Sequence, residues 1–250
     1  YTAVAPYMRG YGDTERPPVE PGNYETLLLG SDVLSMTAAL GATDPLVVGH
    51  DWGAIAVTAA SVADADALGT AVTMAVPPNF MAQLDDYASQ ALRSWYMTEF
   101  QIPGHGEEIL RRDDFALVER LWRLWSPDMT DSTRQDHVER VKHTFRTGDT
   151  VEAALMYYRD FFDMFMSRPR TQRDIGGIDV PTLLVAGNHD GCISADMFEG
   201  TTDCYDAYAD LEVLNNAGHF HHAEKPDAVA DRVLDFVAES TYTPHRSRSA

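Results

Sequence analysis

The sequence predicts an α/β fold with a mostly parallel sheet, and three observations carry this prediction. Short apolar runs end in glycine or polar residues, apolar residues at helical spacing follow several of them, and the two patterns alternate up to residue 76 and again after residue 178. With 250 residues, 44% of them hydrophobic, the chain can bury a sizeable core, and its length suits one large domain or a domain with an insertion.

The first part of the chain alternates strand and helix. A strand is expected over 1–7 (YTAVAPY), followed by a loop rich in glycine and proline. Leu29, Val33, Met36 and Leu40 have helical spacing, and Gly41 stands where a helix C-terminal cap belongs. The run 46–49 is short and fully apolar, which predicts a strand buried on both faces. A helix over 54–62 and a strand over 70–76 complete this part.

The middle of the chain has a different pattern. From residue 77 to about 176 no strand is expected, and several helical stretches are rich in large aromatic residues. The α/β pattern resumes with strands at 179–191 (DVPTLLVAGNHDG) and 211–220 (LEVLNNAGHF), and a last helix has Pro226 in its first turn. We expect a core of 1–78 and 177–242, a helical cap of 79–176 and a disordered tail of 243–250.

Charge and cysteine content limit the class of partner. Asp and Glu outnumber Lys and Arg by 39 to 19, so the net charge of −20 argues against nucleic acid and anionic membranes. No apolar run approaches the roughly 20 residues of a membrane span, and no signal peptide is recognised. The two cysteines fit a reducing compartment. We therefore expect a cytoplasmic protein, with a homodimer left open.

Polar residues directly after the predicted strands are the candidates for chemistry. In a parallel sheet, ligands bind beyond the carboxyl ends of the strands, where Asp51, Asp190 and His219 each follow one. The segment GHDWG (49–53) matches a nucleophile elbow, a sharp turn that lifts the nucleophile above the sheet. Asp51 occupies the nucleophile position, and the order nucleophile, acid, histidine completes a catalytic triad.

At these motifs the chain resembles the epoxide hydrolases of the α/β-hydrolase fold, relatives of the haloalkane and haloacetate dehalogenases. The matching segments are RGYG (9–12), GHDWG (49–53), NHDGC (188–192), AGHFHHAEKPD (217–227) and two cap segments, SWYMTEFQIPG (94–104) and ALMYYRDFF (154–162). The resemblance covers nearly the whole chain and implies an α/β-hydrolase core with an inserted helical cap.

The resemblance also implies the reaction. Asp51 would attack an epoxide carbon, and the cap tyrosines Tyr96 and Tyr158 would donate hydrogen bonds to the departing oxygen. His219, oriented by Asp190, would then activate water to hydrolyse the ester and release a vicinal diol. Trp52, through its backbone N–H, would bind the oxyanion, and His50 is assigned with it to oxyanion or substrate binding. No metal or organic cofactor is required by these steps.

The chain departs from the family pattern at its beginning. Family members carry about three strands and an HGxP segment, which supplies the second oxyanion donor, before the point that corresponds to Tyr1. One of those strands lies between the strands expected at 1–7 and 46–49. We therefore expect the N-terminal strands to be missing from this sequence and the natural protein to be longer.

Several alternatives stay open. A dehalogenase shares the Asp nucleophile and the His–Asp pair but stabilises a halide, and a hydrolase-like protein could bind ligands without turnover. Tyr158 shares a helical face with Phe162 and Phe165, so packing alone could explain it. His219, His221 and His222 cluster, but suitable further ligands for a metal are not placed beside them.

Overall fold

The structure, a computed structural model, describes residues 2–83, 88–167 and 175–242. In this part of the chain the sheet has four strands, and they follow one another in the order in which they occur in the sequence. The strands are β1 (Leu46–His50), β2 (Thr70–Met74), β3 (Thr182–Gly187) and β4 (Ala209–Leu214), and all neighbours are parallel. All carboxyl ends therefore lie at one edge of the sheet, as the predicted fold class requires.

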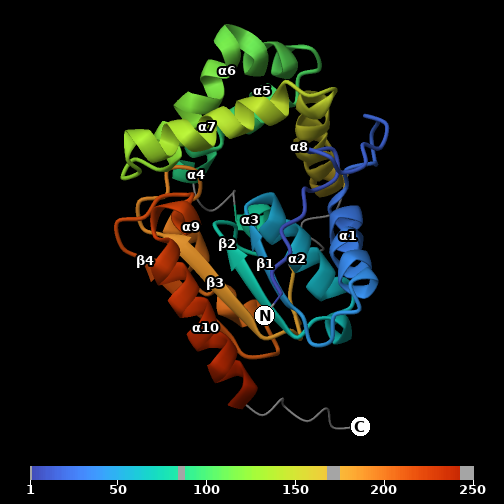
Figure 1. Cartoon of the computed structure of the whole chain (residues 1–250), viewed down its shortest axis with the longest axis vertical. Helices are drawn as coiled ribbons and strands as arrows, with labels where there is room; N and C mark the ends of the chain where they lie inside the picture. Colours follow the sequence, from blue (N-terminus) through green and yellow to red (C-terminus); the bar gives the residue numbers. More distant parts are fainter. Residues whose placement is uncertain (1, 84–87, 168–174, 243–250) are drawn as a thin grey trace.

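Helices cover both faces of this sheet (Figure 1). On one face α1 (Thr26–Ala39) and α2 (Trp52–Ala63) pack together, and Val57 and Ala60 of α2 contact the sheet at Ala71. On the other face α10 (Pro226–Tyr242) brings Val229, Val233 and Phe236 against β2 and β3. The expected last helix, with its proline in the first turn, is confirmed.

The α1 helix shows how local sequence sets an element boundary. Its last residue is Ala39, and Gly41 follows with a φ of 61°, a left-handed conformation that glycine adopts without steric cost. The Gly41 N–H donates to the carbonyl of Ala38 at 3.0 Å. The helix predicted over 29–40 is thereby confirmed, with its start three residues earlier.

Between β2 and β3 the described residues form six helices and no strand. They are α3 (Phe80–Gln83), α4 (Ala88–Arg93), α5 (Trp95–Phe100), α6 (His105–Trp125), α7 (Asp131–Phe145) and α8 (Thr150–Ser167). The longer ones lie over the carboxyl ends of the strands (Figure 1). The α6 helix breaks at Arg112–Phe115, where the backbone leaves the helical region. We call α3–α8 the insertion helices.

Short elements connect the rest of the core. They are the 3₁₀ turns η1 (Ala65–Ala67), η3 (Ala195–Phe198) and η4 (Thr201–Cys204) and the short helix α9 (His221–Glu224). The last follows β4 after a loop of residues 215–220 and carries His221 and His222. The tail expected over 243–250 lies outside the described residues.

Two expectations about strands are wrong. Residues 2–7 form no strand, and Val4 and Tyr7 expose 53% and 56% of their surface. A strand needs a neighbour for its N–H and C=O groups, and no described strand pairs with this segment. The strand β1 is not buried on both faces either, because it lies at the edge of the described sheet and Val48 is 51% exposed.

Candidate active site

Asp51 stands at a sharp corner between β1 and α2. Its backbone φ of 53° and ψ of −118° lie outside the regions that a residue with a side chain favours, a conformation that costs about 1–3 kcal/mol. Gly49 makes the corner possible, because a Cβ there would lie 2.1 Å from the carbonyl oxygen of Gly53. A Cβ on Gly53 would meet nothing within 4 Å, so only the first glycine of the elbow is required by close approach.

The structure brings the three residues of the predicted triad together. His219 Nδ1 lies 2.9 Å from Asp190 Oδ2, and His219 Nε2 lies 3.1 Å from Asp51 Oδ2. The histidine ring is buried, whereas the Asp51 side chain keeps 29% of its surface exposed. One imidazole thus joins a buried carboxylate to an accessible one, which is the geometry of a base held by an acid and facing a nucleophile.

The loop after β3 holds the acid in place. Asp190 Oδ1 accepts hydrogen bonds from the backbone N–H groups of Cys192 at 2.7 Å and Ile193 at 2.9 Å. Arg93 of α4 donates to the carbonyl of Asp190 at 2.6 Å. Because Oδ1 is saturated by two amides, the carboxylate presents Oδ2 to the imidazole of His219.

Two carboxylates determine the charge of the imidazole. Burial alone disfavours the charged ring, but Asp190 and Asp51 overcome it and raise the pKa of His219 to about 10. His219 is therefore protonated at neutral pH. A reaction that neutralises Asp51 removes part of this stabilisation and favours release of the proton.

The residues next to the nucleophile have separate contacts. The backbone N–H of Trp52 donates to Asp51 Oδ1 at 2.8 Å, as an oxyanion donor at this position would. His50 Nε2 lies 2.9 Å from the carbonyl oxygen of His219, so it carries the proton and donates. Burial lowers the pKa of His50 well below its usual value and keeps the ring neutral. The His50 N–H thus bonds to the backbone of His219, and its ring borders the cavity described below.

Tyr96 of α5 and Tyr158 of α8 meet beside Asp51. Their ring centroids are 5.8 Å apart with nearly perpendicular planes, and both rings border a small cavity of about 30 Å³ that also reaches Asp51. The hydroxyl of Tyr96 lies 3.5 Å from the sulfur of Cys192. Burial raises the pKa of both tyrosines well above its usual value, so both hydroxyls stay protonated and can donate.

A larger cavity of about 310 Å³ opens on the other side of the nucleophile. Asp51, Trp52, Tyr158 and His219 border it, and the insertion helices supply apolar walls. These further walls include Phe100, Leu110, Val118, Leu121, Trp122, Trp125, Val141 and Phe145. The cavity therefore suits an apolar small molecule with one reactive polar group held at Asp51.

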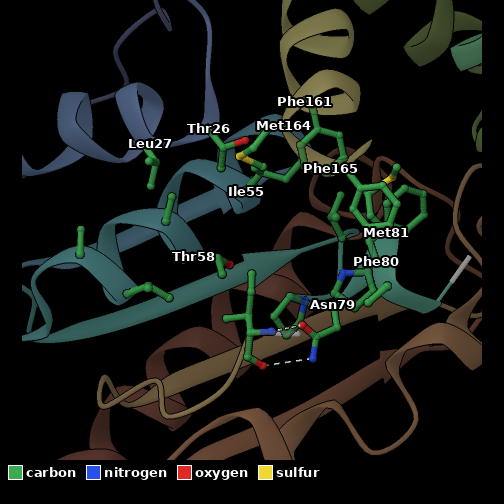
Figure 2. A pocket seen from close by; sticks show the side chains of 18 residues that line it. Thr26, Leu27, Ile55, Thr58, Asn79, Phe80, Met81, Phe161, Met164 and Phe165 are labelled. Atoms are coloured by element: carbon green, nitrogen blue, oxygen red, sulfur yellow. Dashed lines mark hydrogen bonds between the residues drawn. The ribbon is translucent and has the colours of Figure 1, made fainter. Parts of the chain in front are cut away.

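A second apolar cavity, of about 190 Å³, lies between α1, α2 and α8 (Figure 2). Phe161, Met164 and Phe165 of α8 line one part of it, and none of the triad residues borders it. The side-chain amide of Asn79 closes one end through two hydrogen bonds with the backbone of Ile175. Of the three cavities described, two border Asp51 and this one does not.

The histidines near the site do not form a metal centre. Within the described residues, no group of three or more His, Cys, Asp and Glu side chains could hold a metal ion. Burial lowers the pKa of His221 to about 3 and that of His222 to about 4, so both rings are neutral.

No helix in the described part of the chain combines the length and apolar character of a bilayer-crossing segment.

Sequence reasoning missed several residues of the site. Trp125 and Phe220 place their rings 5.2 Å and 5.1 Å from the ring of His219. Tyr11 borders the cavity and comes from the RGYG segment, whose match alone could have indicated it. No sequence signal marks Trp125, because its place depends on how α6 meets the core.

The comparisons with known proteins agree with this geometry. The human protein named epoxide hydrolase 4 is 26% identical over 246 residues, which cover 96% of this chain and 66% of that protein. Epoxide hydrolase A of Mycobacterium tuberculosis is 26% identical over 272 residues, 95% of this chain and 82% of that protein. A crystal structure of a Bacillus megaterium epoxide hydrolase with an inhibitor has a TM-score of 0.78 at 23% identity, covering 92% of this chain and 82% of that one.

The chain thus spans about two thirds of the length of the human relative. A model of the alpha/beta hydrolase family matches residues 1–232, which include the four described strands and the insertion helices. On this match, the chain belongs to the alpha/beta hydrolase family.

Proposed function

We propose that this protein hydrolyses epoxides to vicinal diols through an ester on Asp51. The observation that carries the proposal is the position of the Asp51 carboxylate, which contacts the His219–Asp190 pair and borders the same small cavity as two protonated tyrosines. The names of the human and mycobacterial relatives support it.

The first step is attack by Asp51 on an epoxide carbon. One carboxylate oxygen forms the new C–O bond while the ring C–O bond breaks, and the departing oxygen takes a proton from Tyr96 or Tyr158. Two phenols at one small cavity are suited to this task, because an alkoxide is a poor leaving group without hydrogen-bond donors.

The second step is hydrolysis of the ester. Once Asp51 is esterified, its charge no longer raises the pKa of His219, and the ring can give its proton back to the tyrosinate. The neutral imidazole then takes a proton from water, which attacks the ester carbon of Asp51. The N–H of Trp52 already contacts Oδ1, where the negative charge develops. Collapse of this intermediate passes the proton from His219 to the diol oxygen. The second proton of the attacking water then moves from the new carboxyl group to His219, which restores the Asp51 carboxylate and the protonated ring.

A dehalogenase would use the same triad, but the tyrosine pair favours the epoxide. Halide release needs donors that stabilise an anion, whereas ring opening needs a proton for an alkoxide, and protonated phenols supply it. The test compares diol formation from styrene oxide with halide release from chloro- and bromoalkanes, using the parent and Asp51→Asn. Diol formation that depends on Asp51 is expected; halide release without diol formation would overturn the assignment.

A further inference from the structure

The carbonyl oxygen of Trp125, the last residue of α6, contacts both catalytic loops of the core. It accepts a hydrogen bond from the N–H of Gly191, the residue after the acid Asp190, at 3.1 Å. It also accepts one from the N–H of His219 itself, at 2.9 Å. One carbonyl of an insertion helix thus spans the acid loop and the histidine loop.

The next residue, Ser126, is fully buried and adds a second contact to the histidine loop. Its hydroxyl donates its single proton to Glu224 Oε1 at 2.6 Å and accepts a hydrogen bond from the N–H of Phe220 at 3.0 Å. Both oxygens of Glu224 accept from the N–H of Gly218 at 3.1 Å. Ser126 and Glu224 therefore saturate the two amides on either side of His219.

Hydrogen bonds therefore hold the backbone on both sides of His219. The N–H groups of three consecutive residues, 218, 219 and 220, are all bonded, and the carbonyl of His219 accepts from His50. Two of the three N–H groups bond to the end of α6, outside the α/β core. Because these four backbone atoms are held, the ring of His219 keeps its orientation to Asp190 and Asp51.

The end of α6 lies so close to the acid loop and the histidine loop that neither loop has space for a Cβ atom at the contact. A Cβ on Gly218 would lie 2.5 Å from Cα of Ser126, and a Cβ on Gly191 would lie 1.9 Å from the carbonyl oxygen of Leu124. Glycine at both positions lets α6 dock against both loops. On the other side, Arg134 of α7 holds the turn by donating to the carbonyls of Ser126 and Met129.

We propose that Ser126, with Glu224 as its partner, is a positioning residue that aligns His219 for hydrolysis of the ester on Asp51. The inference rests on the proposed function, because it concerns the second step of that reaction. Ser126 does not border the cavity at Asp51, so it acts through the loop and not on the substrate. Its loss should slow the step in which His219 activates water and leave the attack by Asp51 nearly unchanged.

The test measures the two steps separately. Enzyme in excess is mixed rapidly with styrene oxide and quenched, and intact mass follows the ester as it forms and decays. In Ser126→Ala we expect ester decay to slow by about tenfold to a hundredfold, because small misplacements of a catalytic group have effects of this size. Ester formation should change by less than about threefold, so the ester accumulates.

Ser61→Ala is the matched control. Ser61 is also buried, and its hydroxyl donates to the carbonyl of Val57 within α2, away from the histidine loop. Both steps should keep the parent rates in this variant even where the melting temperature falls. Equal slowing of both steps in Ser126→Ala, or no slowing of either, would overturn the inference.

Glu224 supplies a second test that does not depend on the folding of Ser126→Ala. Oε1 of Glu224 accepts from both Ser126 and Gly218, and the amide oxygen of glutamine can replace it. Glu224→Gln should therefore hydrolyse the ester at close to the parent rate, while Glu224→Ala shows the slow step. Equal rates in the two variants would contradict the proposal.

A parent protein that forms no ester would refute the proposed function, and the positioning of His219 by Ser126 is then tested on its own. In that case the proton between His219 Nδ1 and Asp190 is observed by NMR in the parent, Ser126→Ala and Ser61→Ala. A shift or broadening only in Ser126→Ala supports positioning by Ser126, and an unchanged signal overturns it.

Discussion

His219 Nε2 lies 3.1 Å from Asp51 Oδ2, although 168 residues separate them in the chain. The contact joins the loop after β4 to the corner after β1, and both lie beneath the insertion helices (Figure 1). Because the same ring is bonded to Asp190, a change at any of the three residues should affect a defined step.

Removal of the nucleophile should abolish turnover without loss of the fold. Asp51→Asn keeps the shape of the side chain and an oxygen for the N–H of Trp52 but cannot form the ester. We expect diol formation to fall by about a thousandfold or more, since covalent catalysis has no substitute in this site. Diol is measured by chromatography, with the melting temperature as control; activity near the parent level would remove Asp51 from the mechanism.

Removal of the base should trap the intermediate. In His219→Gln the attack by Asp51 remains available, but water is no longer activated, so ester hydrolysis is expected to slow by about a thousandfold. Intact mass should then show the protein with one covalently bound substrate. Rapid turnover with no such species would show that another group acts as base.

Each tyrosine should contribute to ring opening. Tyr96→Phe and Tyr158→Phe each remove one hydroxyl and keep the ring contacts with Phe100. We expect ester formation to slow by about tenfold to a hundredfold in each variant and more in the double variant. Single-turnover rates of ester formation test this, and the hydrolysis rate of a preformed ester serves as control. Single variants that form ester at the parent rate would leave both tyrosines as packing residues.

The stability of the protein should depend on pH through His219. Its pKa in the folded protein is about 10, above the ordinary histidine value of 6.5, so the protonated ring stabilises the fold. This stabilisation is fully present below pH 6.5 and is lost as the pH rises through 10. In Asp51→Asn the pKa of His219 should be lower, so the stabilisation should be smaller and its loss should be complete at a lower pH. Urea denaturation of both proteins across this range tests the sign; identical pH profiles would contradict it.

Alanine substitutions at the two glycines of the elbow should differ sharply in their effect on the free energy of unfolding. Gly49→Ala places a Cβ 2.1 Å from a carbonyl oxygen, and we expect the free energy of unfolding to fall by about 2–4 kcal/mol. Gly53→Ala adds a methyl group in open space within α2, where alanine is favoured over glycine by up to about 1 kcal/mol. Urea denaturation of the pair provides the comparison. An equal loss in both would show that the corner is not limited by this contact.

Much of the site could be predicted because parallel strands bring distant residues to one edge. Asp51, Asp190 and His219 each follow a strand, and the pairing of β1 with β2, β2 with β3 and β3 with β4 brings the strand ends together. The helices between β2 and β3 are predictable for a different reason, the helical spacing of their apolar residues. Their division from the core as a separate cap remains a proposal.

Other features depend on contacts that no local pattern encodes. The apolar run 2–7 has strand composition but no partner strand among the described residues, and β1 is exposed because it lies at the sheet edge. The contacts of Trp125 and Ser126 with the histidine loop depend on how α6 docks. Nor does the sequence tell that the ring of His50 bonds to a backbone carbonyl.

Single turnover in water enriched in ¹⁸O tests the central claim most directly. Water should attack the ester carbon of Asp51, so the peptide that contains Asp51 gains one heavy oxygen while the diol of the first turnover contains none. Heavy oxygen in the diol, with none in that peptide, would mean that water opens the epoxide directly and would contradict the ester mechanism.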